Sequence, residues 1–245
     1  MVLYALSVFT IMTSVLLCSA EEYTLPVTTC KRNSTDYSNC LKVALEESWP
    51  RFVKGLPEFD FPRWNPFFYQ NGRLVVNRDG VLIRGTVENA TIFGFTSMRF
   101  LDVRPHFMDD VFRLEIDALI PKVFVNVYAA GEINVAGIRL SGKGHVHITL
   151  HESRFTWDMT GHVKNDTWTI EHFPIFMTIE KFLLHFIFFD GGKELGDLFE
   201  VFANEFWPSL YRAIWPMLVS QLIDPEFTDI SNRLFSKVPF SKVFP

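Results

Sequence analysis

The sequence has few of the features that mark nucleic-acid-binding proteins, membrane-spanning proteins and common hydrolases. Lysine and arginine number 23 against 28 aspartates and glutamates, so the net charge is −5 and no basic surface for nucleic acid is expected. After the first segment there is no run of eighteen apolar residues, so we expect no stable membrane insertion. The Gly-x-Ser-x-Gly elbow of esterases and the Walker spacing of phosphate loops are both missing.

Cysteine is also scarce, with three residues in the chain. Cys18 lies in an N-terminal segment that is apolar or small from Val2 to Leu17 and continues with the small residues Cys18–Ala20. This pattern is typical of a secretory signal peptide, which we place at residues 1–20. The sequence therefore predicts a secreted, extracellular protein with a single domain over residues 21–245.

Removal of the signal leaves two cysteines, Cys30 and Cys40, which should form a disulfide in an oxidising compartment. Three Asn-x-Ser/Thr sequons, at Asn33, Asn89 and Asn165, are consistent with secretion and predict glycosylation. Phenylalanine is abundant, with 26 residues. Composition alone leaves open whether these rings fill a core or line a cavity for an apolar ligand.

The strongest pattern is a stretch from Leu195 to Lys237 in which apolar residues recur every third and fourth position. This spacing predicts a long helix. A stripe with a period of four moves around a straight helix, so a continuous helix needs a partner that wraps it. Pro208, Pro216 and Pro225 leave an alternative, in which the helix is interrupted or kinked and packs in pieces.

The region from Arg73 to Phe189 has the alternation of β-strands, as in Phe112–Asp117 and Val146–Leu150. Glycines and prolines recur through it and predict a meander of long antiparallel strands. The apolar run Phe182–Phe189 predicts a strand buried on both faces. We expect a turn at Asp190–Gly192, and a short helix before the sheet, over Leu41–Phe52. The order helix, sheet, long helix indicates an α+β fold.

Several polar groups are of residue types that take part in catalysis or metal binding. His145, His147 and His151 share one face of an alternating strand, which is expected to be a polar outer face and not a metal site. Gly142–Gly144 is expected to form a turn. Glu115 and Asp117 are expected to share a solvent-exposed face with Arg113. The sequence predicts no enzyme, no cofactor and no metal.

At this point the sequence resembles the takeout / juvenile-hormone-binding protein family of secreted insect proteins. The matching features are, in order, Cys30 and Cys40 before Leu41, Lys54–Pro57, Asp117 with Pro121, Tyr128 before Gly131, Gly142–Gly144, Phe188–Gly196, Asn204–Trp207, Pro216 and Lys237–Phe244. The resemblance implies a long, kinked C-terminal helix wrapped by a strongly curved antiparallel sheet around an apolar tunnel. That fold is similar to the one in mammalian bactericidal and lipid-transfer proteins (TULIP-like).

The resemblance implies a monomeric carrier of a small hydrophobic ligand such as a terpenoid, a fatty acid or an odorant, with circadian or feeding roles in some relatives. Two alternatives remain: a defence protein that binds membrane surfaces or lipid aggregates, and a hydrolase of the same ligands. Alternation in the strand and the apolar stripe of the helix suggest the residues that line the tunnel. They are Phe112, Leu114, Ile116, Phe202, Phe206 and Leu210.

Overall fold

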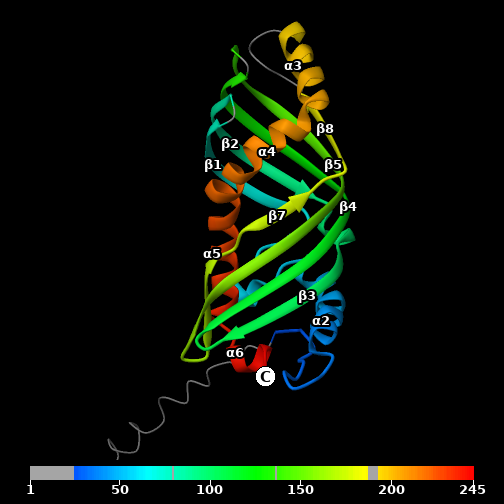
Figure 1. Cartoon of the computed structure of the whole chain (residues 1–245), viewed down its shortest axis with the longest axis vertical. Coiled ribbons are helices and arrows are strands. Elements are labelled where there is room, and N and C mark those ends of the chain that lie inside the picture. Colours follow the sequence, from blue (N-terminus) through cyan, green and yellow to red (C-terminus); the bar gives the residue numbers. More distant parts are fainter. Residues whose placement is uncertain (1–24, 79, 136, 187–192) are drawn as a thin grey trace, which may run out of the picture.

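The computed structural model describes residues 25–78, 80–135, 137–186 and 193–245. The predicted signal peptide and the predicted turn at residues 190–192 lie outside the described residues. The molecule is elongated, with one curved antiparallel sheet along its length and the C-terminal helices running along the open side of that sheet (Figure 1). The N-terminal helix α2 and the last helix α6 lie at one end, called here the α2 end, and α3 lies at the other, the α3 end. This is the predicted α+β architecture.

All the described strands belong to one sheet with the order β1-β2-β4-β5-β6, in which β3 also pairs with β4, and β7 and β8 pair with β5. The two longest strands, β4 and β5, pair with each other along almost their whole length. The strand bounds are β1 Phe67–Arg78, β2 Val81–Phe93, β3 Arg99–Met108, β4 Val111–Val135, β5 Ile138–Lys164, β6 Thr167–His172, β7 Ile175–Thr178 and β8 Lys181–Phe186.

The strands are longer than their glycines and prolines suggested. Gly142–Gly144 lies inside β5, so the prediction of a turn there is wrong. Gly131 lies inside β4, at a position where two backbones approach closely. A Cβ atom on Gly131 would overlap the carbonyl oxygen of Arg84 and lie 2.6 Å from the Cα of Gly85. Gly131 therefore permits a close approach of two strands within the curved sheet, and none of these glycines ends a strand.

The helical prediction for residues 195–237 is confirmed in outline, and the helix is kinked. It consists of α3 Lys193–Glu205, α4 Trp207–Leu218, a π-helical turn η3 Val219–Ile223, and α5 Asp224–Phe235. Phe206 separates α3 from α4, which changes direction there (Figure 1). Pro216 lies inside α4 and Pro225 in the first turn of α5, directly after the π-turn. The helix therefore packs in two main pieces, α3 and the segment from α4 to α5.

The remaining helices lie at the α2 end, apart from two short 3-10 turns. α2 spans Tyr37–Phe52, so the predicted helix is present but begins four residues before Leu41, and α6 spans Phe240–Val243. The 3-10 turns are η1 Pro57–Phe59 and η2 Phe95–Ser97.

Strand β8 differs from its prediction. Phe182, Leu184 and Phe186 are half-buried while the residues between them are exposed, so the prediction of burial on both faces is wrong for the described part. The reason is position: β8 pairs with β5 at an edge of the sheet, and α3 packs on it from one side. Residues 187–189 lie outside the described residues.

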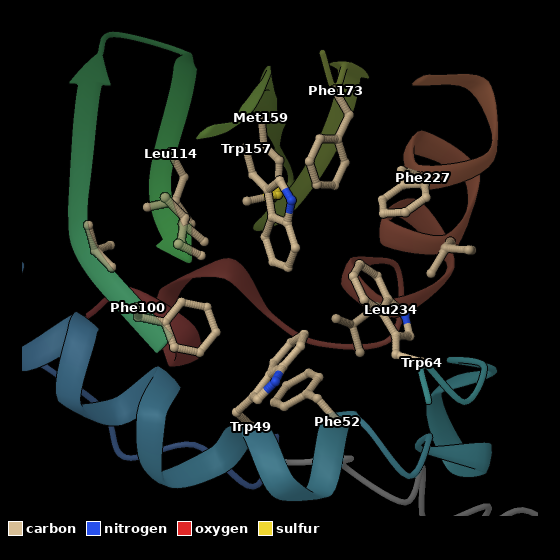
Figure 2. Close-up of a cluster of buried hydrophobic side chains, with 14 of the residues drawn as sticks. Trp49, Phe52, Trp64, Phe100, Leu114, Trp157, Met159, Phe173, Phe227 and Leu234 are labelled. Atoms are coloured by element: carbon tan, nitrogen blue, oxygen red, sulfur yellow. The ribbon is translucent and has the colours of Figure 1, made fainter. Parts of the chain in front are cut away.

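The largest hydrophobic cluster, called here the closed core, fills the molecule toward the α2 end (Figure 2). It is built from large rings contributed by α2, the sheet and α5. Trp64 contacts Trp49, Trp157 and Phe227 with ring centroids 5.0 to 5.7 Å apart. The Trp49 indole nitrogen donates a 2.8 Å hydrogen bond to the carbonyl of Phe95. Many of the 26 phenylalanines and the tryptophans are therefore explained by an aromatic core.

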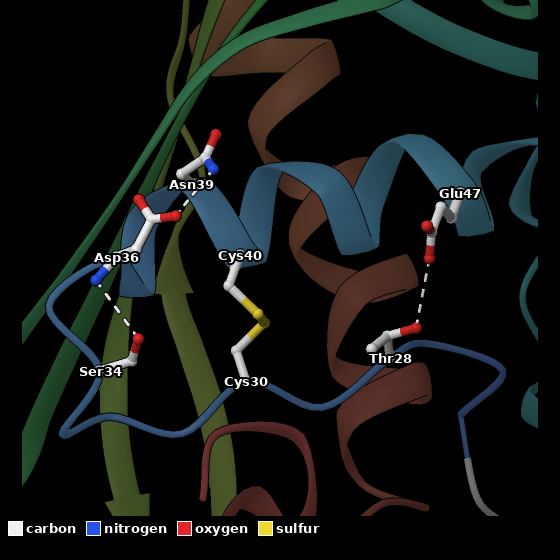
Figure 3. Close-up of a disulfide and its surroundings, with 7 residues drawn as sticks. All are labelled: Thr28, Cys30, Ser34, Asp36, Asn39, Cys40 and Glu47. Atoms are coloured by element: carbon white, nitrogen blue, oxygen red, sulfur yellow. Dashed lines mark hydrogen bonds between the residues drawn. A yellow bond between two sulfur atoms is a disulfide. The ribbon is translucent and has the colours of Figure 1, made fainter.

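The predicted disulfide is present and joins Cys30 to Cys40, ten residues apart (Figure 3). It fastens the extended N-terminal segment to the first turns of α2. The neighbouring Arg32 binds the end of the chain, because its backbone N–H donates to the carbonyl of Pro245 over 3.0 Å. Asn33, Asn89 and Asn165 are all exposed. Their glycosylation stays a prediction.

Candidate ligand-binding interior

Side chains of the C-terminal helices bind the backbone at both edges of the sheet. The side-chain amide of Gln221 accepts from the N–H of Val75 over 2.9 Å and donates to its carbonyl over 2.8 Å, at the edge strand β1. Asn204 forms the same pair of bonds with Leu184 in β8, and Asn232 with Ile170 in β6. Each carboxamide takes the place of a neighbouring strand, so the helices close the curved sheet into a tube-like arrangement.

Further bonds join the helices to the edge formed by β6, β7 and β8. Glu200 accepts from the N–H of Phe186 over 3.0 Å and from the imidazole of His185 over 2.8 Å. The Tyr211 hydroxyl donates to the carbonyl of Met177, and burial raises the pKa of that hydroxyl, which therefore stays protonated. Sequence patterns did not reveal these contacts, because a polar residue on a helix gives no sign of which distant backbone it binds.

The inward face of the sheet changes character along its length. In β4, alternation places Val123, Val125, Val127, Ala129 and Gly131 on one face, and Val123 belongs to the closed core. This is therefore the face that the helices cover. Toward the α3 end the side chains on this face become smaller.

Two transverse rows of this face consist largely of small residues. Strand register gives their members: Gly72, Val87, Ala129 and Gly144 in the first row, and Leu74, Gly85, Gly131 and Gly142 in the second. We call these the small-residue rows. Val87 and Ala129 are half-buried, whereas Ala118 and Ile120 in the closed core are fully buried. The face at the rows is thus built largely of small apolar residues, and Val87 and Ala129 there are less buried than Ala118 and Ile120 of the closed core.

The helices facing this region contribute aliphatic and aromatic side chains. A second, smaller core cluster joins α4 to β1 and β2 through buried Leu74, Val76, Val81 and Ala213. Leu210, Ile214 and Met217 pack against that cluster and remain half-buried.

The six predicted lining residues fall into two separate groups. Phe112, Leu114 and Ile116 are buried in the closed core, where Phe112 contacts Trp168 and Phe240 near the α2 end. Phe202, Phe206 and Leu210 lie in and beside α3 and α4, in the other half of the molecule. Phe206 is 51% exposed, and its ring centroid lies 4.9 Å from that of Phe202. The structure does not bring the two groups together.

A pocket of about 460 Å³ lies at the α2 end, between the N-terminal segment and the C-terminal residues. It is lined mainly by apolar side chains, including Leu25, Val27, Val238 and Val243, with Lys242 among the polar ones. Its walls come from two short segments and not from the sheet. It is a second candidate for an apolar ligand.

The polar groups considered from the sequence belong to the outer surface. Arg104 binds both Glu115 and Asp117, at 2.9 and 2.7 Å, and Arg113 binds Asp158 at 2.8 Å and also Glu115. Glu115 and Asp117 share this face with Arg113, as their spacing predicted, while the pairing with Arg104 and Asp158 was not predicted. Among the described residues no group of three or more histidine, cysteine or acidic side chains is placed to hold a metal ion. Within the same residues, no helix is both long and apolar enough to cross a bilayer.

Comparisons with known proteins agree with this architecture. The model of the family described as haemolymph juvenile hormone binding protein (JHBP) matches residues 8–245. The crystal structure of Takeout 1 from Epiphyas postvittana superposes with a TM-score of 0.72 at 16% sequence identity, covering 89% of this chain and 99% of that one. At this identity the likeness demonstrates a shared fold. No curated protein sequence matches the chain significantly.

Proposed function

Because the chain belongs to the haemolymph juvenile hormone binding protein family, we propose that it carries a small hydrophobic ligand between the helices and the concave face of the sheet. The ligand occupies a tunnel beside the small-residue rows, toward the α3 end. In this arrangement Phe202 and Leu210 contact the ligand, whereas Phe112, Leu114 and Ile116 contribute to the closed core that ends the tunnel.

The observation that carries the proposal is the change from large rings to glycine and alanine on one continuous apolar face. An extended apolar molecule replaces the side-chain volume that the rows do not supply. Burying about 300 Å² of ligand surface at about 25 cal/mol per Å² gives about 7 kcal/mol before the entropy cost of binding. Apolar burial alone therefore provides a useful affinity.

The proposal includes secretion of the chain as a single domain, residues 21–245, after loss of residues 1–20, and transport of the ligand by a monomer. The Cys30–Cys40 disulfide supports an oxidising compartment. The exposure of Asn33, Asn89 and Asn165 supports their glycosylation. Terpenoids, fatty acids and odorants are the ligand classes to be tested first.

Displacement of an apolar fluorophore, N-phenylnaphthylamine, from the pure protein tests this function. Ala129 and Ala130 are neighbours on opposite faces of β4, so they provide a matched pair of variants. Ala129→Phe fills the interior and should lower affinity by about tenfold or more, while Ala130→Phe on the outer face should leave it unchanged. Val243→Phe narrows the second pocket. If Val243→Phe lowers the affinity and Ala129→Phe does not, the ligand binds at the α2 end.

The two alternatives predict other outcomes of the same experiment. A membrane-surface binder would sediment with liposomes, and its retention would not depend on Ala129. A hydrolase would release products from ester ligands, which mass spectrometry of the bound fraction detects. Recovery of intact, stoichiometric ligand supports a carrier, and sedimentation or breakdown would reject it.

A further inference from the structure

Exposed cations gather in two neighbouring transverse rows on the outer face of the sheet. Strand register gives the members of the rows: Arg99, Leu119 and Arg154 in the first, and Lys122, His151 and Lys181 in the second. The four exposed cations are called here the basic band: Arg99, Lys122, Arg154 and Lys181. Their chain neighbours Phe100, Val123 and Ser153 are buried on the opposite side of the sheet, so the basic band faces solvent.

The charges of the basic band are not neutralised by the protein. No ion pair joins any of its four side chains to an acidic residue in the part of the chain that the structure describes. Glu152 and Glu180 adjoin the band in the sequence, and neither pairs with it. In contrast, Arg104 and Arg113 farther along the same face are held by carboxylates at 2.7 to 2.9 Å. The band is therefore a local excess of positive charge on a chain whose net charge is −5.

An apolar row borders the basic band. Phe124 lies two residues beyond Lys122 in β4, and Leu183 lies two residues beyond Lys181 in β8, so both share the outer face with the band. They are 40% and 42% exposed. The Lys122 ammonium lies 4.5 Å from the centroid of the Phe124 ring and covers one side of it. A partner on this face would meet cations and apolar side chains together.

We propose that the basic band, with Phe124 and Leu183, is a docking surface for an acidic segment of another protein. Carboxylates of that segment pair with the cations, and apolar side chains between the carboxylates cover Phe124 and Leu183. The docking surface lies on the opposite side of the sheet from the interior in which the ligand is carried. The inference therefore goes beyond the proposed function and does not depend on it.

The shape of the docking surface favours a protein over a lipid bilayer. The helices lie on the concave side of the sheet, so the docking surface is convex and a flat bilayer would touch only a small part of it (Figure 1). A surface that binds membranes inserts projecting apolar side chains among the lipids. Phe124 and Leu183 are less than half exposed, and Lys122 covers part of the Phe124 ring. An extended peptide can instead follow the curved face.

The test measures the fluorescence anisotropy of a labelled peptide of alternating glutamate and leucine with the full protein. Binding should be saturable and should weaken as salt rises past about 0.1 M, where the Debye length is about 10 Å. A peptide with serine in place of leucine has the same charge and should bind about fivefold more weakly, because it lacks the apolar contact. Equal binding of the two peptides, or no binding of either, would overturn the proposal.

A matched pair of charge reversals locates the site. Lys181→Glu should weaken binding of the glutamate–leucine peptide by about fivefold, since attraction becomes repulsion. Lys143→Glu is the control, because Lys143 is equally exposed on the outer face of β5 but pairs with Ala130, outside the band. It should change the affinity by less than about twofold. Equal losses in the two variants would reduce the effect to net charge and overturn the docking surface.

Two further measurements separate this surface from other sites. Saturating N-phenylnaphthylamine should not displace the peptide, and displacement would place the peptide in the ligand-binding interior and overturn the proposal. Sedimentation of the wild type with phosphatidylserine vesicles, lost in Lys181→Glu, would assign the basic band to membranes instead of proteins. Binding of N-phenylnaphthylamine should be the same in both variants, so a failure of the docking surface leaves the carrier function untouched.

Discussion

The side-chain amide of Asn204 forms two hydrogen bonds, each 2.8 Å long, with the N–H and the carbonyl of Leu184. Asn232 makes the same arrangement with Ile170, at 2.7 and 2.8 Å, in the other half of the molecule. The same pair of amide-to-backbone hydrogen bonds thus joins the helices to the sheet edge in exposed and in buried surroundings. Asn204 is on α3, where Leu198 and Val201 are exposed, whereas Asn232 lies among buried Ile230, Ser231 and Leu234.

Alanine substitutions at these two asparagines should affect different processes, global unfolding at Asn232 and local opening at Asn204. Each substitution removes two bonds worth about 1 kcal/mol apiece. Asn232→Ala should lower the free energy of unfolding by about 2 kcal/mol in urea titrations. Asn204→Ala should change that value little and instead speed amide hydrogen exchange in α3 and β8, since α3 opens locally. Equal effects of the two variants on global unfolding would contradict this division.

Removal of the Cys30–Cys40 disulfide should destabilise the fold. Replacing both residues with serine should lower the free energy of unfolding by about 3 kcal/mol, because the short loop is no longer closed in the unfolded chain. Thermal denaturation of the variant and of reduced wild type measures this. The two samples should agree. A large loss in the variant that reduction fails to reproduce would assign the effect to the serines.

Alanine at two different glycines should change the free energy of unfolding in opposite directions. Gly131→Ala should cost about 2 to 4 kcal/mol, since its Cβ would meet the backbone of β2 and its φ is +157°. Gly196 lies in α3 and a Cβ there meets no atom within 4 Å. Gly196→Ala should therefore stabilise the helix by about 1 kcal/mol. Calorimetry of both variants checks the signs, and a tolerated alanine at Gly131 would mean that β2 and β4 separate easily.

The carboxyl group of Asp117 should make the free energy of unfolding depend on pH in the acid range. The hydrogen bond from Arg104 lowers its pKa below the ordinary value of 3.8, and Thr156 adds a second bond, while burial opposes both. A carboxyl whose folded pKa is depressed stabilises the fold above the unfolded pKa and loses that contribution as pH falls through the folded pKa. Asp117→Asn should therefore cost stability at pH 7 and progressively less below about pH 3.8.

Urea midpoints of wild type and Asp117→Asn at neutral pH and near pH 2 would measure this difference. Asp229→Asn is the control, because Asp229 forms an exposed pair with Arg233 one helical turn away, at 3.4 Å. Such a pair contributes less than about 0.5 kcal/mol at either pH. If Asp117→Asn lowers the urea midpoint by the same amount at neutral pH and near pH 2, the carboxylate of Asp117 is not the source of the pH dependence.

The sequence predicted the features that depend on local spacing. A period of four in apolar residues gave the helical region, and counting cysteines after signal removal gave the disulfide. The sheet was predicted as a meander, but β4 and β5 are longer than expected. Glycines such as Gly131 and Gly161 look like breakers in a sequence, and in the fold they allow neighbouring backbones to approach.

The position of the candidate site could not be predicted, for two physical reasons. Irregularities near Asn89 and Glu152, both with positive φ, change which residues face inward, so alternation cannot be followed along a whole strand. The polar contacts that close the structure also join residues far apart in the chain, such as Val75 and Gln221 at a separation of 146. No local pattern records such a pairing.

Because the C-terminal helices bind both edges of the sheet, the order of synthesis matters for folding. Translation makes the strands before it makes Asn204, Gln221 and Asn232, so a growing chain carries a curved sheet with unpaired backbone along two borders. Such borders invite pairing with other chains. The sheet edges therefore stay open to aggregation until the residues from Lys193 onward are synthesised. An early stop codon in this region would yield an aggregation-prone fragment and not a smaller carrier.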